Sequence, residues 1–447
     1  MKAIPMDDAA ADRAPNTIEM LSFGGTQFAA SIYMAFSSYY LMMFLTDVAL
    51  IPSAATAVLL FCFRLFCAID TQAAGIFVNR MNFKDGKYRL YYKWCALPFA
   101  LSLAALGLTP YIGVSFRIVY AAFILIVCDL SWTMLSMASF SMLPYLARDD
   151  ASRSKFISFS NGSSIAAYIL VGTFLLPISK LLGGDNRDNG LSLALVLLAA
   201  LALPLFYNAY FRLRERHYSA LREKPAIKDV FLAIGQNRRV LLFLAGFCLY
   251  CMGDGFKNLT AYYYLTHVMG RPDLLPVAIL AGLISPLAMQ PVIPRLLKFA
   301  KKEKLIVIGL FAASASALLM LAAGTRPVAL IFCVVLYGMF TAVVANLVYA
   351  VTASFSDEMR ARRNISMSEI LTASMNLCSN FGVGIASGAA AMAMAAFGYS
   401  AQAASQTAGS IVGIKVLYIV CTAAGLVLSG IVMLFFNKKV ASAPYPE

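Results

Sequence analysis

Long apolar runs dominate this sequence and constrain its fold more than any other feature. The chain has 447 residues, of which 61% are hydrophobic and 13% are charged, whereas soluble domains carry about 25% charged residues. Many of the runs reach about 18 residues, and a helix of about 20 residues spans the hydrocarbon core of a bilayer. The sequence therefore predicts an all-α membrane protein, because a β-barrel would show alternating segments of about 10 residues.

The apolar runs predict twelve transmembrane helices, separated into two groups of six by one long polar connector. The predicted organisation is a cytoplasmic tail (1–19), an N-terminal six-helix bundle (20–213), a cytoplasmic linker (214–238), a C-terminal six-helix bundle (239–436) and a second tail (437–447). The predicted helices are 20–45, 54–78, 91–111, 115–146, 157–182, 191–213, 239–267, 274–298, 304–323, 327–353, 367–397 and 410–436.

The positive charges are distributed unevenly between alternate loops. Two of the 36 lysines and arginines, Arg64 and Lys257, are predicted to lie within the membrane, and 28 lie in the loops, helix ends and tails on the side of the two termini. Cytoplasmic loops of membrane proteins carry such an excess of positive charge. We therefore expect both termini in the cytoplasm of a multi-pass cell-membrane protein, and contact with anionic lipids in place of nucleic acid. The other six positive charges are Arg117, Lys180, Arg187, Arg271, Arg326 and Lys415.

Five charged residues lie deep inside the predicted helices, away from the helix ends. They lie on the second, fourth and seventh helices, and each costs roughly 2.5–3.5 kcal/mol at the centre of a bilayer. Such residues usually face the interior of a helix bundle or a wet cavity. The pattern therefore predicts a polar path through the membrane, which is typical of a transporter. The five residues are Arg64, Asp70, Asp129, Asp254 and Lys257.

A short pattern occurs once in each half of the chain. The first predicted helix ends in Leu45-Thr46-Asp47-Val48, and the seventh ends in Leu265-Thr266-His267-Val268. Two six-helix halves with a binding site between them are the architecture of the major facilitator fold. We therefore expect this fold, with twelve helices in two six-helix halves.

Several segments together resemble the glycoside–pentoside–hexuronide:cation symporters. The resemblance covers nearly the whole chain and implies the major facilitator fold and symport of sugars. The segments that carry it are Tyr40-Leu41-Met42 through Thr46-Asp47-Val48, Arg64-Leu65-Phe66-Cys67-Ala68-Ile69-Asp70 with Gly75, Gly86-Lys87-Tyr88-Arg89, and Ala261-x-Tyr263-Tyr264 through Gly270, Asp273-Leu274 and Pro276.

The charged residues that the family uses for its coupling cation are replaced here. The resemblance places its two cation-binding carboxylates at Cys67 and Thr71, its asparagine at Asp70 and a cation-liganding threonine at Thr133. Only one formal negative charge is left in this set. We therefore expect coupling to a proton, or no coupling, in place of sodium.

The sugar-binding residues that the family uses are also replaced. Its two carboxylates fall on Ser31 and Ser136, its arginine on Asn161 and its lysine on Asn380. Uncharged groups such as these contribute about 0.5–1.5 kcal/mol per hydrogen bond. The replacements favour a different or less polar substrate. Two aromatic positions are kept in kind, as Trp132 and Phe140.

Two interpretations are open for each intramembrane charge. Asp70 is either the proton- or cation-linked carboxylate, with Arg64 beside it, or one half of a structural salt bridge with Arg64. Asp129 either replaces the missing sugar-binding carboxylate or lies solvated near the interface. Asp254 and Lys257, spaced i, i+3, either contact substrate or form a pair that neutralises itself and locks the helix.

The predicted function is secondary transport of a sugar, glycoside or similar small solute by alternating access. The alternatives are an exporter or flippase of an amphiphilic molecule and a membrane sensor that keeps the fold. An enzyme is not expected, because no catalytic motif is present. The chain has no P-loop, and we expect no cofactor. With nine cysteines in no metal-binding pattern and two histidines, His217 and His267, we expect no metal site. The working unit is predicted to be a monomer.

Overall fold

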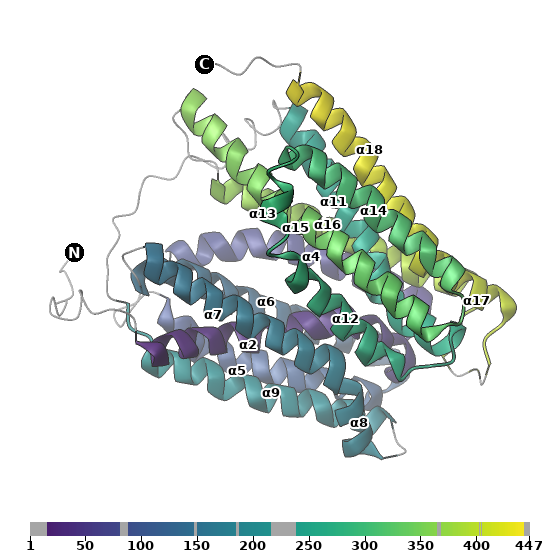
Figure 1. Cartoon of the computed structure of the whole chain (residues 1–447). Coiled ribbons are helices and arrows are strands. Elements are labelled where there is room, and N and C mark those ends of the chain that lie inside the picture. Colours follow the sequence, from purple (N-terminus) through teal and green to yellow (C-terminus); the bar gives the residue numbers. More distant parts are fainter. Residues whose placement is uncertain are drawn as a thin grey trace. The chain divides into compact units, whose positions relative to one another are not determined.

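The computed structural model describes residues 16–80, 88–146, 150–184, 187–215, 238–363, 368–401, 403 and 405–441. These residues form helices and no strand, as Figure 1 shows. The α-helices are α2 (Thr17–Tyr39), α3 (Leu41–Met43), α4 (Ser53–Arg80), α5 (Arg89–Leu106), α6 (Val114–Leu146), α7 (Asp150–Ile169), α8 (Leu175–Gly183), α9 (Arg187–Arg212), α11 (Arg238–Tyr263), α12 (Leu274–Met289), α13 (Ile293–Leu296), α14 (Lys302–Ala323), α15 (Pro327–Arg363), α16 (Ser368–Ala396), α17 (Ala408–Lys415) and α18 (Thr422–Ala441). Shorter turns are π-helical or 3-10: η1 (Phe44–Val48), η2 (Thr109–Tyr111), η3 (Leu170–Phe174), η4 (Tyr264–Val268) and η5 (Val416–Cys421).

A helix occupies each of the twelve predicted ranges. Within the described part of the chain, nine helical segments are long and apolar enough to cross a membrane. There are ten if α2 and the segment Leu41–Val48, bent by 63° from it, form one span, and α12 is a shorter apolar helix. The all-α membrane fold is therefore confirmed, whereas the number of twelve spans stays a prediction.

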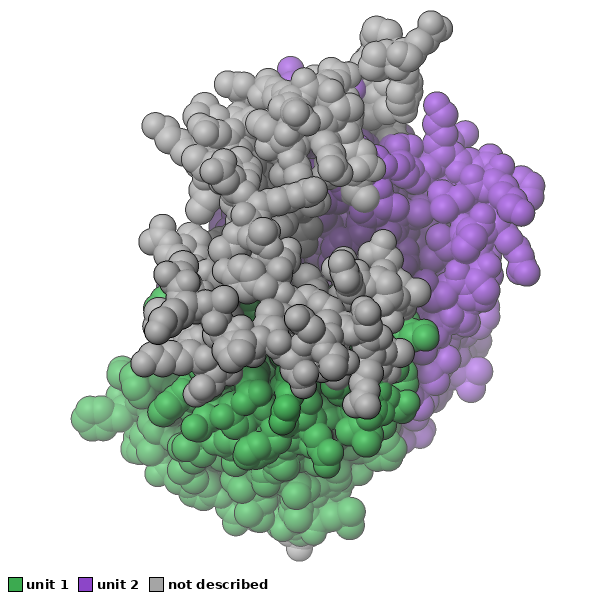
Figure 2. Space-filling model, turned by 90° about the vertical axis from the view of Figure 1, so that its left-hand side faces the viewer, with its two compact units in different colours: residues 1–37, 69–222 green, residues 38–68, 223–447 purple. Residues whose placement is uncertain are grey.

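The chain forms two compact units, which Figure 2 shows in different colours. Unit 1 comprises residues 1–37 and 69–222, and unit 2 comprises residues 38–68 and 223–447. The end of the first predicted span and the first part of α4 thus belong to the unit that holds the C-terminal half. The division into two six-helix bundles with boundaries at 213 and 239 stays a prediction. Gly86, Lys87 and His217 lie outside the described residues.

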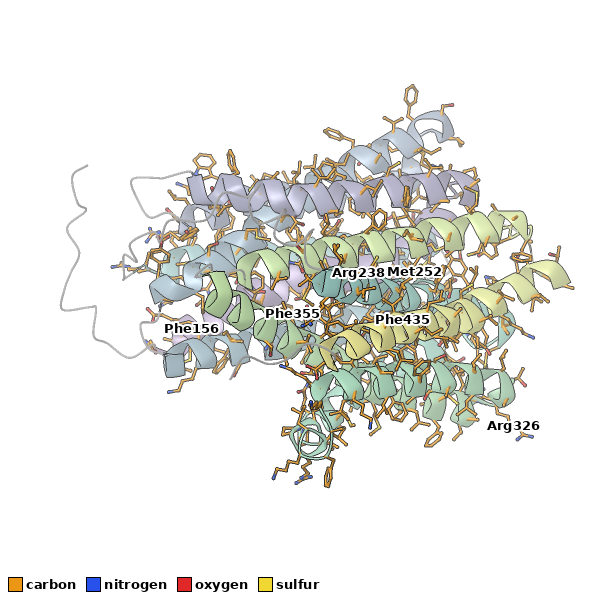
Figure 3. The ribbon with its side chains drawn as sticks, turned by 90° about the horizontal axis from the view of Figure 1, so that it is seen from above. Phe156, Arg238, Met252, Arg326, Phe355 and Phe435 are labelled. Atoms are coloured by element: carbon orange, nitrogen blue, oxygen red, sulfur yellow. The ribbon has the colours of Figure 1, made fainter. Side chains whose placement is uncertain are left out.

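Unit 1 is organised around α5, which packs against both α6 and α9. Its core is aromatic: the ring of Phe99 meets that of Phe206 edge-on at 5.7 Å, and Phe156, labelled in Figure 3, meets Phe23 edge-on at 5.5 Å. The first turn of α5 is capped by a residue that is remote in the sequence. Glu215 Oε1, beyond the end of α9, accepts hydrogen bonds from the backbone N–H groups of Tyr88 at 2.6 Å and Arg89 at 3.0 Å.

Unit 2 is organised around α11, which packs against both α16 and α18. Phe243, Phe355 and Phe436 pack ring against ring where α11, α15 and α18 meet, with centroids 5.5 to 5.8 Å apart. Figure 3 labels Phe355 and, one residue before Phe436, Phe435.

Two glycines of α16 explain why the first part of α4 belongs to unit 2. A Cβ atom on Gly384 would lie 2.9 Å from Cβ of Arg64, and one on Gly388 would lie 3.1 Å from Cβ of Phe61. Small residues spaced by four on a membrane helix allow close approach of a neighbouring helix. The spacing of Gly384 and Gly388 therefore seats residues 61–64 directly on α16.

The repeated Leu-Thr-x-Val pattern has the same backbone structure in both places. It forms the π-helical turns η1 and η4, whose residue numbers differ by 220. The N–H of Ala49 bonds to the carbonyl of Phe44 at 2.7 Å, and the N–H of Met269 bonds to that of Tyr264 at 3.1 Å. The internal repeat is therefore present in the backbone as well as in the sequence.

Candidate functional site

Unit 1 holds a polar cluster between α2 and α6. Asp129, only 4% exposed, accepts a hydrogen bond of 3.3 Å from the hydroxyl of Tyr33 through Oδ1. Trp132, one turn further along α6, donates its indole N–H to the backbone carbonyl of Ala30 at 3.0 Å. The rings of Tyr33 and Trp132 lie 6.2 Å apart. This arrangement fixes a carboxylate and an indole side by side, a combination that suits a molecule with both hydroxyl groups and an apolar face.

Asp70 lies at a second polar position of unit 1. It is 4% exposed, and its carboxylate interacts with the hydroxyl of Thr133, which is 1% exposed. The contact is looser than a full hydrogen bond, because Asp70 Oδ2 and Thr133 Oγ1 both lack a hydrogen-bond partner among the described residues. Asp70 also forms no ion pair within the described part of the chain. Asp70 is therefore a buried carboxylate with few polar partners in the described part of the chain.

The other predicted residues of unit 1 lie in different environments. Ser31, beside Ala30 on α2, and Ser136, one turn after Thr133 on α6, are buried. Thr71 is half-buried, whereas Asn161 on α7 is exposed. Phe140 is 63% exposed. Within the described residues, no hydrogen bond joins Ser31, Ser136 or Asn161 to Asp129, so the structure brings Asp129 and Trp132 together but not the whole predicted set.

Unit 2 holds a second cluster, around Asp254 on α11. Asp254 Oδ2 accepts a hydrogen bond of 2.8 Å from the side-chain amide of Asn258, and Oδ1 accepts one of 2.9 Å from the hydroxyl of Tyr337 on α15. The ammonium of Lys257 lies over the ring of the same tyrosine, 4.6 Å from its centroid. Tyr337 therefore contacts both charged residues, one through its hydroxyl and one through its ring.

Asp254 and Lys257 do not form the close pair that their spacing allows. They are half-buried, and no ion pair within 4.0 Å joins them in the described part of the chain. The carboxylate still attracts the ammonium over the longer distance. A cation over an aromatic face is stabilised by about 0.5–2 kcal/mol. This contact holds the Lys257 ammonium over the Tyr337 ring, at a distance from the Asp254 carboxylate.

Arg64 and Asn380 are also in unit 2. Arg64 is 8% exposed and reaches α16 at Gly384, one turn after Asn380, which is half-buried. Cys67, where the family has a carboxylate, is buried. Arg64 and Asn380 thus lie on two helices of unit 2, α4 and α16, that approach closely at Gly384.

Sequence reasoning missed three residues of these clusters: Tyr33, Asn258 and Tyr337. Asn258 had a local signal, because an aspartate and an asparagine spaced i, i+4 on a helix can bond. The two tyrosines had none, because Tyr33 and Tyr337 lie 96 and 83 positions from their carboxylate partners.

A family model described as MFS/sugar transport protein matches residues 22–438. The chain belongs to this family. It is 23% identical over 425 residues to the isoprimeverose transporter of Lactiplantibacillus pentosus, a match that covers 94% of this chain and 88% of that protein. It is also 20% identical over 431 residues to a putative glycoside/cation symporter of Escherichia coli (strain K12), covering 95% and 92%.

Solved structures of membrane transporters have a similar fold. The inward open conformation of the xylose transporter XylE from E. coli matches with a TM-score of 0.63 at 14% sequence identity, covering 94% of this chain and 95% of that chain. This likeness establishes the major facilitator fold alone. The predicted resemblance to the glycoside–pentoside–hexuronide:cation symporters is confirmed by the family match and by the two relatives.

Proposed function

We propose that this MFS/sugar transport family member is a secondary transporter that moves a sugar, glycoside or similar small solute by alternating access. The observation that carries the proposal is that each unit holds a carboxylate inside apolar helices, Asp129 in unit 1 and Asp254 in unit 2, each bonded to a tyrosine hydroxyl. Such groups are costly in a membrane and mark solute paths. The names of the relatives, an isoprimeverose transporter and a putative glycoside/cation symporter, support a sugar-like solute.

We propose solute contacts within each of the two clusters. Asp129 accepts hydrogen bonds from solute hydroxyl groups, and Trp132 packs against an apolar face of the solute. Asp254 and Lys257 supply an acceptor and a donor, held by Tyr337. The other proposed contacts are Ser31, Ser136, Phe140, Asn161 and Asn380.

The coupling ion that we propose is a proton bound at Asp70, with Thr71, Thr133 and Arg64 as supporting residues. Sodium prefers several hard oxygen ligands, and a site with Cys67 and Thr71 in place of two carboxylates has lost most of its negative charge. A proton needs one carboxylate. The burial of Asp70 and its loose contact with Thr133 support this role.

We further propose a monomer in the cell (inner) membrane with both termini in the cytoplasm. The distribution of lysine and arginine supports this orientation. We expect no covalent chemistry and no cofactor.

Counterflow in proteoliposomes tests the proposed function directly. Purified protein is reconstituted with an unlabelled pentose, hexose, glycoside or hexuronate inside, and entry of the labelled compound is followed. We expect at least one compound to exchange about tenfold faster than in liposomes without protein, and Lys257→Met to slow that exchange. Absence of exchange for the whole panel, with protein that unfolds cooperatively on heating, would contradict the proposal.

A further inference from the structure

A chain of hydrogen bonds converges on Asp47, at the end of unit 2 where the π-helical turns η1 and η4 lie. Tyr399, which follows α16, donates its hydroxyl to Asp47 Oδ1 at 2.8 Å. Thr46 Oγ1 lies 2.9 Å from the same oxygen and 2.6 Å from the hydroxyl of Tyr263. His267 Nε2 lies 3.3 Å from the hydroxyl of Tyr399. Five side chains from three separate segments are thus linked.

Counting donors fixes where the hydrogens are. A tyrosine hydroxyl has one hydrogen to donate, and Tyr399 gives it to the carboxylate of Asp47. The bond between Tyr399 and His267 therefore requires that His267 Nε2 carries a hydrogen and donates it. By the same reasoning, Tyr263 donates to Thr46 when Thr46 donates to Asp47.

The linked side chains are packed as well as bonded. Thr46 is 3% exposed, Tyr263 is fully buried and Tyr399 is 8% exposed. The ring of Tyr399 meets that of Tyr263 edge-on at 5.3 Å and lies 5.5 Å from the ring of His267. This packing holds the ends of three segments of unit 2 together: η1, η4 and the residues after α16.

Asp47 and His267 occupy equivalent positions of the repeat. They are the fourth residue of η1 and the fourth residue of η4. The repeat therefore supplies an acidic side chain from one copy and a basic one from the other, and Tyr399 joins them.

We propose that Asp47, Tyr399 and His267 form a proton-binding site that fastens these three segments together. When His267 already donates through Nε2, a proton bound at Nδ1 leaves the bond to Tyr399 in place. It adds a positive charge two hydrogen bonds away from the Asp47 carboxylate. Protonation of His267 therefore strengthens the interaction that holds η1, η4 and the residues after α16 together, and loss of the proton weakens it.

The site goes beyond the proposed function, because it depends on neither the solute nor Asp70. In the predicted topology it lies at the extracytoplasmic ends of the spans. Acidification outside the cell would then keep these ends of unit 2 together.

The other charged and titratable groups near this site are paired with each other, exposed or stacked on another ring. Arg271 and Asp273, just after η4, form an exposed ion pair of 2.9 Å with each other. α17, which packs against η4, carries Lys415, which is exposed. Tyr264 of η4 stacks on Tyr418 at 4.4 Å. Histidine is the group of this neighbourhood whose ordinary pKa of about 6.5 falls in the physiological range.

Hydrogen exchange of the two turns tests the proposal in the full-length protein in lipid nanodiscs. The amides of Ala49 and Met269 are hydrogen-bonded within η1 and η4, and their rates are divided by the chemical exchange rate at each pH. Between about pH 8 and about pH 5.5, where an imidazole titrates, we expect their protection to rise about tenfold. In His267→Gln, which keeps a donor for Tyr399, protection should change less than about twofold over this range.

Matched variants separate this site from other protonation sites. His217→Gln, which removes the other histidine of the chain, and Asp70→Asn should keep the tenfold response. A response that persists in His267→Gln, that disappears in Asp70→Asn, or that is absent from the unaltered protein overturns the proposal.

A spectroscopic measurement covers the case in which His267→Gln does not fold. In His217→Gln labelled with nitrogen-15 histidine, one imidazole remains, and its signals should titrate between about pH 5 and about pH 8. Tyr399→Phe, which keeps the ring and removes both hydrogen bonds, should move the midpoint of that titration. Absence of titration, or an unchanged midpoint in Tyr399→Phe, overturns the proposal.

Discussion

Leu50 and Gly270 have the same left-handed backbone conformation, with φ angles of 53° and 64°. Leu50 follows the π-helical turn η1 and Gly270 follows η4, and the N–H of the next residue bonds back into the turn: Ile51 to Leu45 at 2.9 Å and Arg271 to Leu265 at 2.9 Å. The repeat thus requires a positive φ at this place. One copy meets the requirement with glycine, and the other bears the strain of a leucine.

Gly270→Ala should destabilise the protein by about 1–2 kcal/mol, because a side chain in the left-handed region costs about that much. No atom lies within 4 Å of the added methyl group, so the loss measures backbone strain alone. Gly162→Ala is the matched control. It also has open space around the new Cβ but lies inside α7, where alanine is favoured by about 0.5–1 kcal/mol. Thermal unfolding in detergent should show a lower midpoint for the first variant only.

Asp70→Asn should abolish accumulation of solute against a gradient while leaving counterflow measurable, because the asparagine cannot carry the proton. Accumulation driven by a pH gradient and counterflow are measured in the same proteoliposomes. Full accumulation in this variant would move the coupling role to Asp129 or Asp254. Loss of folded protein would favour a structural role for Asp70.

Sodium should not stimulate uptake, because the positions of the two cation-binding carboxylates of the family are Cys67 and Thr71 here. Uptake is compared in sodium and in choline buffers at equal ionic strength and pH. Uptake that rises about tenfold in sodium and is lost in Asp70→Asn would mean that one carboxylate suffices for sodium.

Tyr337→Phe should weaken solute binding by about twofold to tenfold, the equivalent of about 0.5–1.5 kcal/mol for one hydrogen bond. The variant leaves the ring beneath Lys257 and removes the donor to Asp254. Tyr349→Phe, an exposed position on the same helix, should leave binding unchanged. The half-saturating concentration in counterflow is the measurement. Equal half-saturating concentrations for Tyr337→Phe and Tyr349→Phe would mean that Asp254 does not contact the solute.

Glu215→Ala should loosen the first turn of α5, because the carboxylate that accepts from the N–H groups of Tyr88 and Arg89 is lost. Removing an acceptor at the start of a helix costs about 0.5–2 kcal/mol. Hydrogen exchange of these two amides should become roughly tenfold faster, and Glu215→Gln, which retains one oxygen acceptor, should show a smaller change. Unchanged exchange in the alanine variant would mean that the cap has no energetic effect.

The fold was largely predictable because membrane spans are defined by length and apolarity, which are local properties of the sequence. The repeat of Leu-Thr-x-Val was visible as well, and the structure gives both copies the same turn. Their π-helical form was not predictable, since the extra residue in the turn depends on how the segments pack. The membership of residues 38–68 in unit 2 was missed for the same reason, because it depends on contacts with α16 through Gly384 and Gly388.

The candidate sites were only partly predictable. The buried carboxylates Asp70, Asp129 and Asp254 stood out because charge is rare in apolar helices. Their partners did not, because Tyr33 and Tyr337 come from other helices. The i, i+3 spacing of Asp254 and Lys257 allowed a direct pair, whereas in the structure Tyr337 contacts both residues, bonding to Asp254 through its hydroxyl and lying beneath the ammonium of Lys257.

The bond from the Trp132 indole to the carbonyl of Ala30 gives the protein a built-in optical probe. The chain contains two tryptophans, and the other, Trp94, is 66% exposed. Trp94→Phe would leave a single fluorophore, 6.2 Å from the ring of Tyr33 and one turn from Asp129. The emission of that variant would then report the arrival of a solute in unit 1 without any attached dye.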